Sequence, residues 1–267
     1  MSGRKIAFIG GGNMAAAIIQ GLLTAKSSLP EQITVADISP ERRAWLTEHL
    51  KVIATADNAA AVRGAEIVVL AVKPQQASDV LGALQAELTP KHLLISICAG
   101  LPTSRLEQLV PARVVRVMPN LPALIQRGVA AICGGARATE ADLALTEELF
   151  ATTGTVVRVP EDKMNEVTAL SGSGPGYVFA FIEALEAAGI EQGLEPATAR
   201  LLAVETMRGA AEMAAKTGKA PAELRRQVCS PGGTTLAGLA AMQEKGFDEA
   251  VAAGVRAARD RSAELAR

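Results

Sequence analysis

The chain has 267 residues, of which 49% are hydrophobic, so it is long enough to bury one large core or two smaller ones. Lys and Arg total 27 and Asp and Glu total 28, a balance that favours neither nucleic acid nor an anionic membrane. Aromatic residues are 3%, which disfavours a base-stacking surface, and the apolar runs are too short to span a membrane. We therefore expect no nucleic-acid partner and no membrane partner.

The three cysteines, Cys98, Cys133 and Cys229, form no Cys-x-x-Cys pair and lack the spacing of metal ligands. They are typical of small reduced core residues, so we expect no bound metal and a reducing compartment. The first residues predict a strand and a glycine turn rather than a signal peptide. The expected location is the cytoplasm.

The first part of the chain alternates between predicted strands and predicted helices. An apolar strand over 5–9 precedes Gly10–Gly12 and a helix over about 13–25. The further predicted strands cover 33–36, 66–72, 93–98 and 114–118, and the helices between them include one capped by Ser39 with Pro40 at its first position, one over 75–87 and one over 103–109. This alternation predicts an α/β fold with a doubly wound parallel sheet of the Rossmann type.

From about Asp162 onward helical patterns dominate and strand patterns disappear. Pro160 and the charged residues after it mark the expected boundary. We therefore expect a dinucleotide-binding Rossmann domain over 1–160 and an all-α C-terminal domain over 161–267.

The sequence Gly10-Gly11-Gly12-Asn13-Met14-Ala15 matches G-x-G-x-x-G/A between a strand and a helix, the context that this dinucleotide-binding pattern requires. The glycines permit a tight turn and close approach of a pyrophosphate to the main chain. Asp37, at the end of the second strand, can accept a hydrogen bond from a ribose 2′-hydroxyl, which favours NAD. Arg42 and Arg43 could instead meet a 2′-phosphate or form surface salt bridges, so the choice between NAD and NADP stays open.

Six motifs occur in an order and spacing similar to those of pyrroline-5-carboxylate reductases: FIGGGNMA at 8–15, AVKPQ at 71–75, CAG at 98–100, VRVMPN at 115–120, SGSGP at 171–175 and SPGGTT at 230–235. The chain resembles this family along nearly its whole length. The last two motifs are the most diagnostic, because general Rossmann dehydrogenases lack them. The resemblance implies hydride transfer from NAD(P)H to the C=N bond of 1-pyrroline-5-carboxylate, giving L-proline in proline biosynthesis.

The resemblance implies NADP(H) or NAD(H) as cofactor, with NADP(H) slightly favoured. The glycine motif, Asp37 and the resemblance together give these expected cofactor-binding residues: Ile9, Gly10, Gly11, Gly12, Asn13, Met14, Asp37, Ser39, Asn58, Ala71, Val72, Lys73, Pro74, Cys98, Ala99, Gly100 and Asn120. Three residues near the expected cofactor site depart from the family pattern. Asp37-Ile38 replaces a frequent Asn-Arg, and Leu121 replaces a usual Thr.

The SPGGTT segment reads as a loop before a helix that starts near Thr235, and successive free amides there suit a small carboxylate. Taken alone, the loop is better explained as an ordinary helix N-terminus without a ligand. The resemblance implies substrate binding by Ser230, Gly233, Thr234 and Thr235, with the catalytic Thr235 facing the ring nitrogen, and by Glu161 near the amino group. Cys229 replaces a usual Ser or Thr. SGSGP is expected to form a sharp entry into a long helix over about 176–188, with a structural rather than a catalytic role.

Two other functions fit parts of the sequence. A β-hydroxyacid dehydrogenase-like oxidoreductase needs K-x-x-x-N after its glycine-rich segment, whereas here Lys163 and Asn165 precede SGSGP. A non-catalytic NAD(P)-sensing protein would have no need of SPGGTT. His49 and His92 do not follow a predicted strand, which disfavours a 2-hydroxyacid dehydrogenase. The resemblance also implies a homodimer or larger homo-oligomer that associates through the C-terminal helices.

Overall fold

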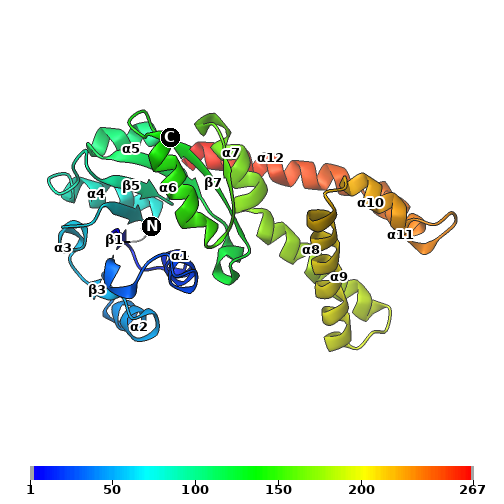
Figure 1. Cartoon of the computed structure of the whole chain (residues 1–267). Coiled ribbons are helices and arrows are strands. Elements are labelled where there is room, and N and C mark those ends of the chain that lie inside the picture. The colour runs from blue at the N-terminus through cyan, green and yellow to red at the C-terminus, as the bar shows by residue number, and fades with distance from the viewer. Residues whose placement is uncertain (1–2, 266–267) are drawn as a thin grey trace. The chain divides into compact units, whose positions relative to one another are not determined.

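The computed structural model describes residues 3–265, which divide into two compact units (Figure 1). One unit contains the described residues up to Ser173 together with those from Ala258 onward, and the other is Gly174–Ala257. The expected functional division at residue 160 stays a prediction. Within residues 3–265, no helix combines the length and apolar character needed to cross a membrane.

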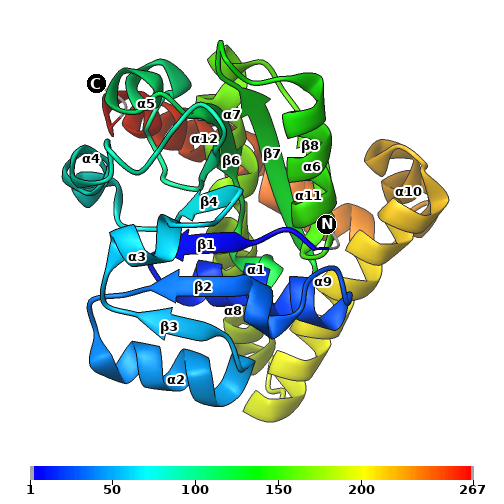
Figure 2. The ribbon, with the colours of Figure 1, turned by 60° about the vertical axis from the view of Figure 1, so that its left-hand side comes forward.

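The first unit is built on an eight-stranded sheet with the order β3-β2-β1-β4-β5-β6-β7-β8, and its β1–β4 side faces the viewer in Figure 2. The strands are β1 (Ile6–Ile9), β2 (Ile33–Ala36), β3 (Ile53–Thr55), β4 (Ile67–Leu70), β5 (Leu93–Ser96), β6 (Arg113–Met118), β7 (Gly128–Gly134) and β8 (Gly154–Arg158). All neighbouring pairs are parallel except β6 and β7. The expected Rossmann-type sheet is confirmed.

The antiparallel β6–β7 pair follows from the short connection between these strands, which holds only the 3₁₀ turn η2 (Leu121–Ile125). A parallel pair requires a crossover of a dozen or more residues, usually through a helix. The strands β3, β7 and β8 were not among those that the apolar pattern predicted. β3 and β8 have no fully buried residue, so their patterns are weak.

Helices cover both faces of the sheet. α1 (Asn13–Thr24), α2 (Pro40–Leu50) and α6 (Glu140–Ala151) contribute to a core with Phe8, Val35 and Val69. α3 (Asn58–Val62), α4 (Pro74–Ala83) and α5 (Thr103–Leu109) pack on the other face, against Ile9 and Leu94. β1 and β4 are buried on both faces, as expected for inner parallel strands. The predicted cap of α2 is confirmed, because Ser39 Oγ accepts a hydrogen bond from Arg42 N at 3.0 Å.

After β8 the chain forms the 3₁₀ turn η3 (Glu161–Lys163), α7 (Met164–Val167) and the π-helical segment η4 (Thr168–Gly172). Ser173 has helical dihedrals, φ −83° and ψ −22°. The expected long helix follows as α8 (Gly174–Glu191), and the chain enters it through a bend at Ser173. The last turns of α12 (Phe247–Leu265) return to this unit, where Ser262 Oγ donates to Asn165 Oδ1 at 2.9 Å.

The second unit is helical, as expected. Besides the first part of α12 it contains α8 (Gly174–Glu191), α9 (Pro196–Thr217), α10 (Pro221–Val228) and α11 (Thr234–Glu244). α8 and α9 pack closely at Gly189, where an added Cβ would lie 3.2 Å from the Ala199 Cβ. Glu186 and Arg200 add a salt bridge of 2.9 Å between these two helices.

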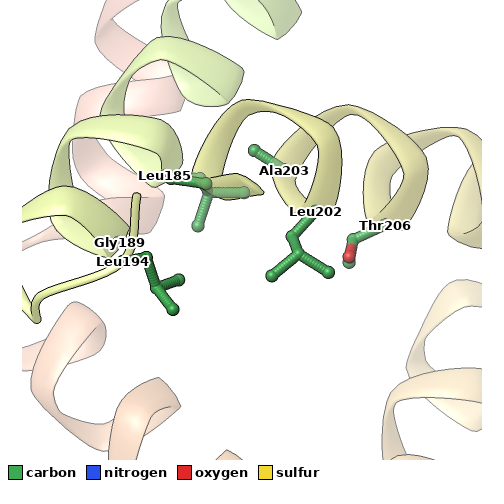
Figure 3. A pocket seen from close by; sticks show the side chains of 7 residues that line it. Leu185, Gly189, Leu194, Leu202, Ala203 and Thr206 are labelled. Carbon is green, nitrogen blue, oxygen red and sulfur yellow. The ribbon is translucent and has the colours of Figure 1, made fainter. Parts of the chain in front are cut away.

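Much of the second unit's apolar surface is uncovered. Over residues 174–257 the buried side chains are Ala199 and Ala203 alone. Figure 3 shows Leu185, Leu194 and Leu202 around an open hollow of about 200 Å³ beside α8 and α9. A helical unit with so small a core cannot stabilise itself by apolar burial, so a further surface must cover it.

Candidate active site

The predicted cofactor residues lie along one edge of the sheet, because the inner parallel strands end in register. Ile9 pairs with Ala36 on β2 and with Leu70 on β4, and Leu70 pairs with Ser96 on β5. The segments 10–15, 37–39, 71–74 and 98–100 each follow one of these strand ends. The carboxyl edge of a doubly wound sheet is where such folds bind ligands, and β1 and β4 flank the point where the strand order reverses.

The glycine turn after β1 requires its glycines for different reasons. Gly10 has φ +97°, and a Cβ there would lie 2.6 Å from the Ala71 carbonyl oxygen. Gly12 is the N-cap of α1, provides no side-chain cap, and has nothing within 4 Å of an added Cβ. The first amides of α1 therefore adjoin open space. A pyrophosphate fits such a helix start, where main-chain amides and the helix dipole favour negative charge.

Asp37 connects this turn to the end of β2. Its Oδ2 accepts from Gly11 N at 2.8 Å and its Oδ1 accepts from Ser39 N at 2.9 Å. The carboxylate is thus held by two main-chain amides from different segments. It places a negative charge beside the turn, where the ribose of a dinucleotide lies in this fold class.

The arginines after Asp37 hold main-chain carbonyls rather than forming the surface salt bridges considered from the sequence. Arg42 donates from Nε to Gly11 O and from Nη2 to Gly12 O at 3.2 Å. Its guanidinium lies 4.4 Å from the ring centroid of Trp45. Arg43 Nη1 donates to the carbonyl oxygen of Asp37 at 2.7 Å. A contact of either side chain with a 2′-phosphate stays a prediction.

The segments after β4 and β5 are joined by Cys98. Its thiol is buried and donates to the Val72 carbonyl oxygen at 3.3 Å, and burial raises the pKa of the thiol to about 11. Lys73 is exposed at the N-cap of α4, and Pro74 is the first residue of that helix, one residue before the expected start. The hydrogen bond from Cys98 to Val72 joins the segments 71–74 and 98–100, which form one wall of the predicted nicotinamide site.

A hollow of about 340 Å³ lies beside this wall, lined by Pro74, Ala99, Gly100 and Arg105 among others. Gly100 has φ +77°, and a Cβ there would lie 3.1 Å from the carbonyl oxygen of Leu265 in α12. A larger residue would therefore be strained at this position.

Two further expected cofactor residues follow the ends of β3 and β6. Asn58 is the half-buried first residue of α3, and Thr55 at the end of β3 pairs with Ala36, so Asn58 follows a strand that ends at the same edge. Asn120 is 8% exposed and uses both ends of its amide: Oδ1 accepts from Val129 N at 2.8 Å, and Nδ2 donates to Ser171 O at 3.0 Å. The expected contact of Asn120 with the nicotinamide stays a prediction.

Glu161 lies beside the N-terminus of α5. Its Oε1 accepts from Thr103 N at 2.6 Å, and its Oε2 accepts from the Thr103 hydroxyl. The buried Arg116 of β6 faces it, with 3.5 Å between Nη1 and Oε1. Sequence reasoning missed Thr103 and Arg116. The available signal was a charge inside an apolar strand, VVRVM. The expected contact of Glu161 with a substrate stays a prediction.

The SPGGTT loop lies in the second unit. Gly232 has φ +68°, Gly233 N donates to Ser230 O at 2.9 Å, and α11 begins at Thr234, one residue before the expected start. Gly233 provides no side-chain cap, and Thr234 and Thr235 are exposed. The first amides of α11 and two hydroxyls thus share one helix start, which suits a carboxylate.

Residues 161–265 match the family model described as pyrroline-5-carboxylate reductase dimerisation, and residues 5–100 match that described as NADP oxidoreductase, coenzyme F420-dependent. A pyrroline-5-carboxylate reductase of Methanosarcina acetivorans is 42% identical over 99% of each chain. One of Pseudomonas aeruginosa is 41% identical over 100% of this chain and 98% of that protein. This chain belongs to the pyrroline-5-carboxylate reductase family.

Solved pyrroline-5-carboxylate reductases share the fold along the whole chain. The structure from Coxiella burnetii has a TM-score of 0.93 and 36% identity over 99% of each chain. That from Plasmodium falciparum, with NADP bound, has a TM-score of 0.90 and 31% identity over 100% of each chain. The resemblance inferred from the six motifs is confirmed, and the match to a dimerisation model identifies the helical region as one of oligomerisation.

Proposed function

We propose that this protein is a pyrroline-5-carboxylate reductase, which reduces the C=N bond of 1-pyrroline-5-carboxylate with NAD(P)H and releases L-proline. Full-length membership of the reductase family carries this proposal. The two other functions considered from the sequence lack comparable support. The chain lacks the Lys–Asn spacing of β-hydroxyacid dehydrogenases. A non-catalytic sensor would not need the SPGGTT loop, which is present here.

NADP(H) is slightly favoured by the family, and the Plasmodium relative has NADP bound, whereas the charge of Asp37 favours NAD(H). The amides at the start of α1, beside Gly12, are proposed to hold the pyrophosphate. Asp37, Ser39 and Asn58 are assigned to the adenosine end, and the segments 71–74 and 98–100 to the nicotinamide end. When bound, the reduced nicotinamide supplies the hydride.

The substrate's carboxylate is assigned to the first amides of α11 and to Ser230. Thr235, in the first turn of this helix, is assigned to the ring nitrogen, where its hydroxyl donates a hydrogen bond or orients the proton that the imine gains. A cyclic imine is protonated more readily than a ketone, so a strong acid is not required. The two histidines fit this chemistry. His49 lies in the last turn of α2, where its Nδ1 contacts the Trp45 carbonyl oxygen at 3.0 Å. His92, whose Nδ1 accepts from Thr89 N, directly precedes β5, so neither histidine follows the carboxyl end of a strand.

The protein is proposed to act as a homodimer or larger homo-oligomer joined through the C-terminal helices. The uncovered apolar side chains of α8 and α9 support this assembly. A cytoplasmic location is proposed because Cys98, Cys133 and Cys229 are free thiols.

The purified protein tests the proposal directly. NAD(P)H oxidation is measured with 1-pyrroline-5-carboxylate, and L-proline is quantified in the product. Parallel assays with NAD(P)⁺ and 3-hydroxy acids test the dehydrogenase alternative. Cofactor binding without turnover of either substrate class would instead support a sensor and overturn the proposed function.

A further inference from the structure

Helix α5 is capped by a side chain from a distant part of the chain. The segment 98–102 leads directly into α5, whose own N-cap, Pro102, has no side chain that can accept a hydrogen bond. Glu161, 58 residues further along the chain, serves as the cap instead, because its carboxylate accepts hydrogen bonds from both the amide and the hydroxyl of Thr103. A carboxylate at a helix N-terminus satisfies a free amide and interacts favourably with the helix dipole.

The positive charge of the buried Arg116 balances the negative charge of Glu161. The Arg116 side chain is 5% exposed, its Nη1 lies 3.5 Å from Glu161 Oε1, and its Nη2 has no partner among the described residues. A buried guanidinium is strongly destabilising when its carboxylate is removed. Cys133 pairs with Arg116 in the β6–β7 ladder. Burial, and to a lesser extent the negative charge of Glu161, raise the pKa of this thiol to about 12, while Arg116 lowers it.

The clamp formed by the hydrogen bonds between Glu161 and Thr103 lies two residues after Leu101, the last of the consecutive residues that line the hollow. Ala99, Gly100 and Leu101 line the hollow of about 340 Å³, and Thr103 is the first residue of α5 after them. Thr103 is 4% exposed, so its position is set by packing and by Glu161 together. A shift of Thr103 would move the main chain of 99–101.

We propose that Glu161 is a positioning residue that acts through Thr103 to fix the segment 98–102 against the cofactor, rather than a ligand of the substrate. This inference rests on the proposed function, in which that segment adjoins the nicotinamide. Both carboxylate oxygens of Glu161 already accept hydrogen bonds from Thr103. Thr103 is therefore a second positioning residue, and Arg116 supplies the positive charge opposite the Glu161 carboxylate.

A double-mutant cycle tests the coupling, with Glu161→Ala, Thr103→Val, their combination, and Thr103→Ser as the conservative variant. NADPH affinity is measured by fluorescence titration, and KM and kcat by steady-state kinetics. Thr103→Val removes one hydrogen bond to Glu161 and Glu161→Ala removes both. We expect each to weaken NADPH binding by about 5- to 10-fold, less than the loss of a direct hydrogen bond to a charged group, because neither side chain touches the cofactor. The double variant should bind NADPH no more weakly than Glu161→Ala. The KM for the imine should change little, and Thr103→Ser should bind NADPH as the parent does.

Asp162→Ala, which removes the adjacent exposed carboxylate, is the control and should match the parent.

Hydrogen–deuterium exchange over 98–106 gives a readout that needs neither cofactor nor turnover. Faster exchange is expected in Glu161→Ala and Thr103→Val, and unchanged exchange in Asp162→Ala. An inactive parent enzyme would refute the proposed function, while exchange would still report on the clamp. A raised KM for the imine with unchanged NADPH affinity would make Glu161 a substrate ligand. Lower thermal stability alone, with unchanged binding and exchange, would make the contact merely structural. Either result overturns the proposal. If Glu161→Ala does not fold, Thr103→Val carries the test.

Discussion

The carboxylate of Asp37 accepts a hydrogen bond from the main-chain amide of Gly11 at 2.8 Å, which joins the end of β2 to the glycine turn after β1. The negative charge of Asp37 therefore lies beside the first glycine turn, where it favours a ribose hydroxyl over a phosphate. The family's frequent Asn at this position has no such charge.

Replacing Asp37 with Asn should shift cofactor selectivity toward NADPH. The amide keeps the size of the side chain and one acceptor oxygen, but it removes the repulsion of a 2′-phosphate. We expect the ratio of kcat/KM for NADPH to that for NADH to rise by about tenfold, which corresponds to about 1.4 kcal/mol. Steady-state kinetics with both cofactors measures this ratio. An unchanged ratio would show that Asp37 serves only to hold the turn.

Gly12 and Gly10 should respond differently to an added side chain. Gly12→Val meets open space in the protein, so it should leave thermal stability nearly unchanged and weaken NAD(P)H binding at least about tenfold by obstructing the pyrophosphate. Gly10→Ala is the matched control. Its Cβ would clash with the Ala71 carbonyl oxygen, so it should lower the melting temperature. Fluorescence titration and thermal unfolding separate the two effects, and unchanged affinity in Gly12→Val would remove this loop from the site.

Thr235→Ala should lower kcat/KM for the imine by about 10- to 150-fold, because a lost hydrogen bond to a charged group costs about 1.5–3 kcal/mol. Its exposed position in the first turn of α11 predicts little change in folding or in cofactor affinity. Thr235→Ser keeps the hydroxyl and should recover much of the activity. If the alanine variant has the same kinetics as the parent, Thr235 has no catalytic role and serves only at the start of the helix.

The native mass should be at least twice the 27.6 kDa of one chain. Leu201 and Leu202 on α9 are 61% and 52% exposed, so a second copy is expected to cover them. Leu202→Glu should weaken association, whereas Lys216→Gln on the same helix changes charge without removing apolar area. Sedimentation velocity compares the three proteins. A monomeric parent would contradict the predicted assembly.

Asp142 should contribute stability that disappears in acid. Burial raises the pKa of this carboxyl, but hydrogen bonds from Thr139 and Arg113 outweigh burial, and the pKa lies below its usual 3.8. A lowered folded-state pKa stabilises the protein above the unfolded value and ceases to do so as the pH falls through the folded value. Asp142→Asn should therefore cost about 1–3 kcal/mol of unfolding free energy at neutral pH. Urea unfolding at several pH values should show this difference shrinking below pH 3.8. A constant difference would exclude the ionised carboxylate as its cause.

Several parts of the fold were predictable because their causes are local in the chain. The apolar run of β1, the glycine turn and the start of α1 are consecutive, and Ser39 caps α2 through an amide three residues away. Parallel strands of similar length end at one edge, so AVKP and CAG could be assigned to that edge without knowing any contact. The six motifs indicated the family to which the chain belongs.

Tertiary structure alone decided which partners these residues have. Glu161 reaches Thr103 across 58 residues, and the Asn120 amide reaches Ser171 across 51. Their local patterns predict neither contact, because a carboxylate or an amide satisfies any donor of suitable geometry that the fold brings to it. The sequence by itself determined the strand–turn–helix units and the residues at their ends. The packing of those units determined which polar groups are bound within the protein and which, such as the first amides of α1 and α11, have no side-chain cap and suit a ligand.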